Sequence, residues 1–213
     1  MEKTPELPEL LRLIDGRSAA FRAAVGSAPS LDVPVPTCPE WTLFDLAQHL
    51  GQGRRFWDAA VATDRGCWTW WGTSQSPGTC AAVARHQLQE VAVHTYDAQL
   101  TLGAPEPLPD EVALDGVEEF LSTCCATTDA WPHEPAAVDY HATEGRSWRL
   151  SLSADGARTA RLPGTGTMPE ADASLRGTAG ELVLALYGRV PVDSLKLDGE
   201  RRIFDQLLAW DPA

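Results

Sequence analysis

The feature that most constrains this chain is an uninterrupted stretch at residues 83–101, which contains neither glycine nor proline. His86, Glu90 and His94 follow one another there at intervals of four residues, so a helix would place all three on one face. At about 100° per residue, Asp97 falls within the same stripe, which is roughly 80° wide. The sequence therefore predicts a helix with four ionisable side chains on one side.

The positions beside this stripe are apolar, with Val91 and Ala98 on one side and Val93 and Leu100 on the other. A solvated helix face would not be bordered by apolar side chains on both sides, so the stripe is expected to face inward. Buried ionisable groups are costly unless they bind one another or a metal. Glutamate and histidine four residues apart can reach one ion in front of a helix, although a helix surface with incidental charges has the same spacing.

The composition narrows the class of function. The chain has 213 residues, enough for one large or two small domains with a proper core, and a net charge of −13. This charge, without a Lys/Arg cluster, argues against binding a phosphate backbone. The N-terminus lacks a basic segment followed by an apolar one, and no run approaches the roughly 18 apolar residues of a membrane span. We therefore expect a cytoplasmic protein without nucleic-acid or membrane partners.

The cysteines and tryptophans add little to the choice of function. The five cysteines are odd in number and include no Cys-x-x-Cys, so neither a disulfide framework nor a thiolate zinc site is expected. The adjacent Cys124 and Cys125 are expected to pack rather than to act in redox chemistry. Among eight tryptophans, Trp68, Trp70 and Trp71 cluster, which favours core packing, with the wall of a small-molecule pocket as the alternative.

Two helices are expected before the central one. Residues 6–26 place apolar side chains at three- and four-residue intervals, which predicts an amphipathic helix. Residues 32–41 contain three prolines and are expected to form a rigid extended connector.

The start of the second helix is well marked. Thr42 can act as the N-cap, Asp45 lies three residues later as in a capping box, and Trp41 can pack on Leu46 as a hydrophobic staple. His49 lies at the edge of this helix's apolar stripe, which makes it a candidate third metal ligand. A histidine at a helix boundary bonded to water or backbone is the alternative.

Two separated segments resemble the signatures of a known family. The segment VPTCPEWTLFDLAQHL at residues 35–50 resembles the N-terminal signature of the mycothiol-dependent maleylpyruvate isomerase family, which is related to the DinB-like metal-binding helix bundles. The segment QEVAVHTYDA at residues 89–98 resembles its second signature, and DGVEEFL at residues 115–121 is similar to the helix that usually follows.

The resemblance implies a divalent metal, typically zinc, held by His49, Glu90 and His94. Two histidines and one carboxylate leave an open coordination position, which is typical of catalytic zinc. Asp97 matches a further functional acidic position, and its place three residues after His94 suits a partner of that ligand or a proton carrier. His86 matches no position of the family motif. We prefer a polar residue at the rim of the pocket, then an acid or base, then a fourth ligand.

The resemblance also implies the fold. We expect an α+β protein with a DinB-like helical domain at residues 1–130 and a small, sterol-carrier-like α+β domain at residues 138–213. The short connection after the His49 helix predicts a bundle shortened by about one helix compared with the family. Either the loop together with residues 108–128, or another subunit, would fill the gap, so a monomer and a homodimer are both considered.

The C-terminal third has the pattern of an α+β domain. Strands are expected where apolar and polar residues alternate, around residues 148–152, and at 158–162 after the Asp155-Gly156 turn. A third strand near residues 173–176, a helix at about 179–187, a segment at 194–198 and a last helix at 200–210 complete it. A helix is also expected at about 110–127, and residues 131–137 are interpreted as an interdomain linker.

In the resembling family, the C-terminal domain is thought to help hold the substrate or the thiol. Arg201 is the candidate for a substrate-facing cation, together with its neighbour Arg202. The alternative is an exposed arginine pair that opens a helix.

The resemblance implies that a thiol cosubstrate, mycothiol, takes the open metal position. Metal coordination lowers the pKa of a thiol and provides a nucleophile at neutral pH. Addition to a small electrophile with an activated double bond gives a thioether. Rotation and elimination would isomerise the substrate, whereas release of the adduct would make a conjugate. We therefore expect a metal-dependent isomerase or S-transferase.

Two other functions remain open. The first is a metal-dependent isomerase or lyase of a biosynthetic or catabolic pathway in which no thiol is needed. The second is a non-catalytic binding or resistance protein that sequesters a small molecule.

Overall fold

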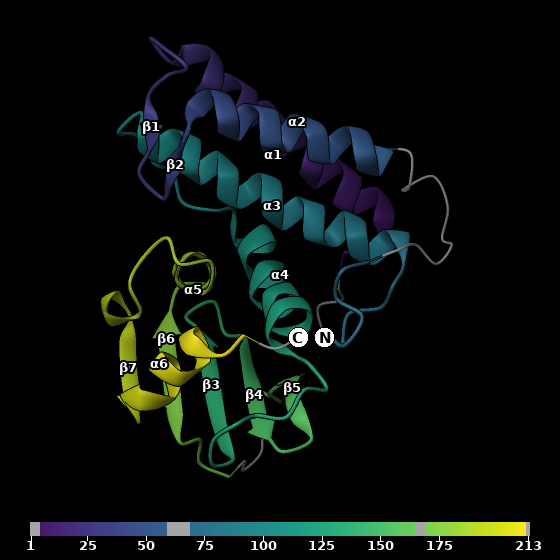
Figure 1. Ribbon diagram of the computed structural model, residues 1–213, viewed down its shortest axis with the longest axis vertical. Helices are drawn as coiled ribbons and strands as arrows, with labels where there is room; N and C mark the ends of the chain where they lie inside the picture. Colours follow the sequence, from purple (N-terminus) through teal and green to yellow (C-terminus); the bar gives the residue numbers. More distant parts are fainter. Residues whose placement is uncertain (1–4, 59–68, 165–168, 212–213) are drawn as a thin grey trace. The chain divides into compact units, whose positions relative to one another are not determined.

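Figure 1 shows the computed structural model of the protein, which describes residues 5–58, 69–164 and 169–211. The chain forms two compact units and has the expected α+β class. The first unit contains the residues up to Thr69 together with Gly78–Val112, and the second contains Trp70–Pro77 together with Ala113–Ala213. The expected domain limits, 1–130 and 138–213, stay a prediction; the observed units place residues 113–130 with the C-terminal part.

The first unit is built on three helices within its described residues: α1 (Leu7–Ser27), α2 (Leu43–Asp58) and α3 (Cys80–Thr101). Both α1 and α2 pack on α3 (Figure 1). All three helices expected from the sequence are present. The shortened bundle, and what fills the gap that it would leave, stay predictions.

The proline-rich connector folds as a short antiparallel hairpin of β1 (Pro34–Val35) and β2 (Cys38–Thr42). The hairpin leads directly into α2, and the capping box expected there is confirmed. The backbone N–H of Thr42 donates to Asp45 Oδ2 at 2.9 Å, and the N–H of Asp45 donates to Thr42 Oγ1 at 3.3 Å. These bonds satisfy backbone donors at the helix start.

One apolar cluster joins the hairpin to the helices. Val35 of the hairpin is wholly buried and shares this cluster with Leu43 and Leu46 of α2 and Val91 of α3. Trp41 packs against the same cluster, of which Leu46 is a member, and the expected staple between these two residues stays a prediction. The hairpin is therefore fixed to α2 and α3 by apolar burial.

The second unit contains a five-stranded sheet with the order β5-β4-β3-β6-β7. Only β3 and β6 run parallel; the other neighbours are antiparallel. The strands are β3 (Ala136–Ala142), β4 (Ser147–Ser153), β5 (Gly156–Arg161), β6 (Ala173–Gly177) and β7 (Lys196–Gly199). The helices α5 (Ala179–Leu186) and α6 (Arg201–Ala209) follow β6 and β7.

The two faces of this sheet differ as strand alternation requires. Val138 and Tyr140 of β3 are buried, and the ring of Tyr140 packs at 6.5 Å from that of Phe204 on α6. The alternate residue Asp139 accepts two bonds from Arg149 of β4, at 2.7 and 2.8 Å. The helix α6 therefore covers the apolar face, and an ion pair lies on the other.

The interpretation of residues 131–137 as a linker is wrong. Trp131 is only 3% exposed, and the last two residues of the segment open β3, the central strand of the sheet. Prolines and alanines have low strand propensity, so this segment lacks a local strand signal. The strand is stabilised by its pairing with both β4 and β6.

The helix expected at 110–127 is α4 (Asp110–Phe120), which continues as a π-helical turn at Leu121–Cys125. The cysteines in the described part of the chain are free thiols, whereas Cys67 and Trp68 lie outside the described residues. None of the helices in the described ranges is long and apolar enough to cross a membrane.

The close approach of Gly156, in the turn between β4 and β5, to the backbone of Thr127 can be tested by substitution. Gly156 has φ +107°, and an added Cβ would collide with the carbonyl oxygen of Thr127, whereas Gly145 has φ +93° and open space. We expect Gly145→Ala to lower the free energy of unfolding by about 1 kcal/mol and Gly156→Ala by about 3 kcal/mol, measured by urea denaturation. Equal losses would contradict the close approach as the cause.

Candidate metal centre

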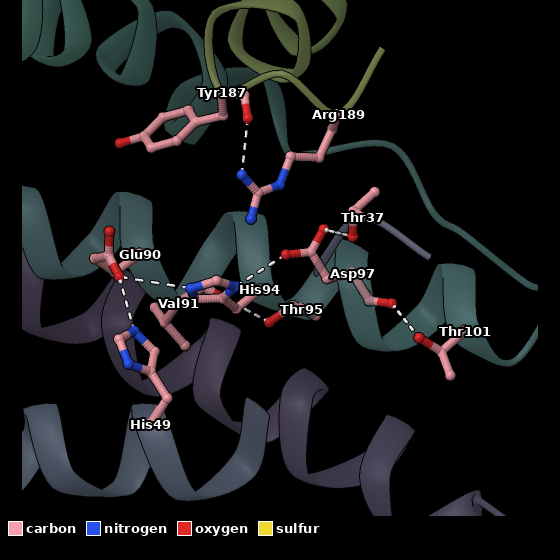
Figure 2. Close-up of polar contacts among 10 residues, drawn as sticks. All are labelled: Thr37, His49, Glu90, Val91, His94, Thr95, Asp97, Thr101, Tyr187 and Arg189. Atoms are coloured by element: carbon pink, nitrogen blue, oxygen red, sulfur yellow. Dashed lines mark hydrogen bonds and ion pairs between the residues drawn. The ribbon is translucent and has the colours of Figure 1, made fainter. Parts of the chain in front are cut away.

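Three potential ligands from two helices converge in the first unit (Figure 2). His49 comes from α2, and Glu90 and His94 come from successive turns of α3. The Nε2 atoms of His49 and His94 lie 3.5 and 3.6 Å from Glu90 Oε2. The three residues that the sequence nominated as ligands are therefore close together.

The separations of the donor atoms suit a small divalent ion. Zinc–ligand bonds of roughly 2.0–2.1 Å at tetrahedral angles put ligand atoms about 3.3 Å apart. The observed 3.5 and 3.6 Å are close to that value. Two imidazoles and one carboxylate fit zinc chemically and leave room for a further ligand.

A second group of potential ligands shares His94. Cys38, His94 and Asp97 also offer donor atoms within 4.8 Å of one another. However, Asp97 Oδ2 lies 2.9 Å from His94 Nδ1, which is a hydrogen-bond distance. With Nδ1 bonded to a carboxylate, the Nε2 atom of His94 is left to face Glu90 and His49. The geometry therefore favours the group that contains Glu90.

Asp97 lies behind the ligands and has no exposed surface. Its Oδ1 accepts a 2.6 Å hydrogen bond from Thr37 Oγ1, and its other oxygen bonds His94 (Figure 2). This arrangement matches a carboxylate that orients a ligand imidazole. The contact with Thr37 was not expected from the sequence, since the two residues are 60 positions apart.

Trp41 is a second residue that sequence reasoning did not assign to the site. Its ring centroid lies 4.9 Å from that of His49 and 6.2 Å from that of His94. The two imidazole rings lie edge to face with centroids 5.2 Å apart. Trp41 therefore packs beside both nitrogen donors.

His86 lies one helical turn before Glu90 and is largely buried. Its Nε2 is 3.7 Å from Glu90 Oε1, the oxygen that does not face the other histidines. Burial acts to raise the pKa of Glu90, but the hydrogen bond from His49 and the charges of His94 and His86 outweigh it and lower this pKa. Glu90 is therefore held as a carboxylate among three imidazoles.

Arg201 belongs to the second unit, where it opens α6. Its guanidinium forms ion pairs with Asp193 and Asp205, and its side chain is 46% exposed. A catalytic role for Arg201 stays a prediction. Figure 2 also draws Tyr187 and Arg189 of this unit, in which Arg189 Nη1 donates to the Tyr187 carbonyl oxygen at 2.7 Å.

Comparison with known families accounts for most of the chain. The N-terminal domain of mycothiol maleylpyruvate isomerase matches residues 11–66 and 59–99, and the MDMPI C-terminal domain matches residues 111–206. The chain belongs to the mycothiol-dependent maleylpyruvate isomerase family. Because the matched domains are those of an isomerase family, they support the assignment of the chain as an enzyme.

Comparison with individual known proteins does not extend the family assignment. A double mutant of the sec-alkyl sulfatase PisA1 is 14% identical over 98% of this chain, with a TM-score of 0.38. The sec-alkylsulfatase Pisa1 from Pseudomonas sp. is 13% identical over the full chain, with a TM-score of 0.35. The chain spans 33% of each of these proteins, and such a distant likeness carries no argument. No curated protein matches the chain.

Removal of the shared carboxylate tests the centre directly. We expect about one zinc per chain in protein purified without chelator, and less than about a tenth of that in Glu90→Gln, because the amide offers a weaker neutral ligand. Glu106→Gln is the matched control, since Glu106 is an exposed glutamate of the same unit that bonds Gln99. Elemental analysis after dialysis gives the measurement. A metal-free wild type would contradict the assignment.

Proposed function

We propose that this protein is a metal-dependent, mycothiol-using enzyme that acts on a small electrophile. The observation that carries the proposal is the convergence of His49, Glu90 and His94, two imidazoles and a carboxylate with room for one more ligand. The family supports the thiol, since its name joins mycothiol to an isomerase. The products of such an enzyme are a cis–trans isomer or a thiol conjugate.

A bound divalent metal would supply a positive charge that lowers the pKa of a coordinating thiol. The protein's own contribution is to hold the donors in place. Asp97 fixes the ring of His94 through Nδ1, and Glu90 presents one oxygen to both ligand imidazoles. Trp41 covers the rings on one side, which limits the orientations of the more exposed His49.

The proposed reaction needs only the thiol and a substrate with an activated double bond. The thiol sulfur bonds one carbon of an activated double bond, and a proton goes to the neighbouring carbon. Isomerisation follows when the new single bond rotates and elimination returns the proton and the thiol. In conjugation the adduct is released instead.

His86 is our candidate for carrying that proton. Its Nε2 lies 3.7 Å from Glu90 Oε1, and it stands outside the ligand group. Asp97 is wholly buried and bonded to both His94 and Thr37, which favours an orienting role over proton transfer.

The proposal is tested by product analysis with and without mycothiol. With maleylpyruvate as the substrate, its trans isomer reports isomerisation and its thioether adduct with mycothiol reports conjugation. We expect one of these products, at a rate above that of a protein-free control, only when metal and mycothiol are both present. Product without any thiol would favour the thiol-independent isomerase or lyase. Tight binding of an electrophile without product would favour the sequestering protein.

The ligand role of His94 predicts a large loss of activity. We expect His94→Ala to lower the thiol-dependent rate by more than about 100-fold, since even the outer partners of a metal ligand are worth 10- to 100-fold. His133→Ala, which removes an exposed histidine of the second unit, is expected to keep the rate within about twofold. Initial rates at saturating mycothiol give the comparison. Similar losses in both variants would argue against a specific role of His94.

A further inference from the structure

The carboxylate of Asp97 has no exposed surface, and each of its oxygens has its own partner. Oδ2 is 2.9 Å from His94 Nδ1, and Oδ1 accepts a 2.6 Å bond from Thr37 Oγ1 (Figure 2). The shorter bond comes from Thr37, a residue outside the candidate ligand group. Thr37 is linked to the centre only through Asp97 and then His94 in this chain of bonds.

The backbone of Thr37 is held firmly enough to direct its hydroxyl. Thr37 lies in the two-residue turn between β1 and β2, after the wholly buried Val35. The base of the hairpin is closed where the N–H of Leu43 donates to the carbonyl of Val33 at 2.9 Å. The segment is therefore fixed on both sides of the turn, so the hydroxyl meets Asp97 from a defined direction.

The Thr37 hydroxyl, as a donor to Oδ1, restricts how the carboxylate can rotate. With the Thr37 hydroxyl at Oδ1, Oδ2 stays directed at His94 Nδ1, and this bond sets the plane of the imidazole. Without the hydroxyl, Oδ1 would lose the 2.6 Å bond from Thr37, and the carboxylate would be less restricted in its rotation. Rotation of the carboxylate would turn the Nε2 atom of His94 away from Glu90.

We propose that Thr37 is a positioning residue of the metal centre, which sets the orientation of His94 through Asp97. The inference rests on the proposed function in one respect only, namely that the ligand group of His94 holds a metal. It adds a residue of the N-terminal hairpin to the machinery of the site. A threonine that only anchors the hairpin would affect folding but not the metal.

The test compares Thr37→Val, which keeps the shape but removes the hydroxyl, with Thr37→Ser, which keeps the hydroxyl. We expect Thr37→Val to weaken zinc binding by about 10- to 100-fold, and Thr37→Ser to stay within about threefold of the wild type. Competition with a chromophoric chelator gives the zinc affinity. The visible spectrum of the cobalt-substituted protein should change in Thr37→Val and return in Thr37→Ser.

Thr95→Val is the matched control. Thr95 is next to His94 on α3 and is buried, but its hydroxyl bonds the backbone carbonyls of Val91 and Arg17, at 2.6 and 3.2 Å. We expect this variant to lose stability in urea without a change in zinc affinity. An equal loss of zinc affinity in Thr95→Val and Thr37→Val would overturn the proposal, because the effect would then be general destabilisation.

A double-mutant comparison tests whether the Thr37 hydroxyl affects zinc affinity through Asp97. In an Asp97→Asn background, Thr37→Val should change zinc affinity by less than about twofold, because the hydroxyl acts through the carboxylate. A full additional loss would overturn that path. Wild-type zinc affinity and cobalt spectrum in Thr37→Val would overturn the positioning role alone. A wild-type protein that binds neither metal would overturn the proposed function as well.

Discussion

The site depends on the burial of one carboxylate. A charged group without exposed surface must have hydrogen-bond partners, and Asp97 finds them in His94 of its own helix and Thr37 of the hairpin. This requirement joins the hairpin to α3 and fixes the imidazole in the same step. Because His94 then faces Glu90 and His49, one buried group links the hairpin to the candidate ligands of α2 and α3.

The two candidate ligand histidines are held by different means. His94 is buried and fixed by the bond to Asp97, whereas the side chain of His49 is 45% exposed. His49 depends on the position of α2, which the capping box of Thr42 and Asp45 defines, and on the ring of Trp41. The short segment before α2 therefore supports both candidate ligand histidines, His94 through Asp97 and His49 through Trp41.

The parts of the fold that follow from local pattern were predictable from the sequence. The period of His86, Glu90 and His94 with apolar borders predicted both α3 and the burial of its polar stripe. The cap of α2 was predictable because its residues are three positions apart. These features depend on neighbours along one helix, which a sequence displays directly.

The parts that depend on distant pairing were not predictable. The bond from Thr37 to Asp97 joins positions 60 residues apart, and nothing in the hairpin's own sequence indicates a partner on α3. The strand β3 was missed for the same reason, because Ala136 and Ala137 become strand residues only through β4. Long-range contacts override weak local propensity in both cases.

The polar stripe of α3 also limits the stabilisation that the first unit gains from burying side chains. Apolar residues at these positions would bury without any need for partners, whereas the carboxylates of Glu90 and Asp97 require specific donors to offset their desolvation. The sequence supplies those donors from α2, from α3 and from the hairpin. Matched polar groups of this kind are typical of functional sites, which commonly exchange local stability for binding.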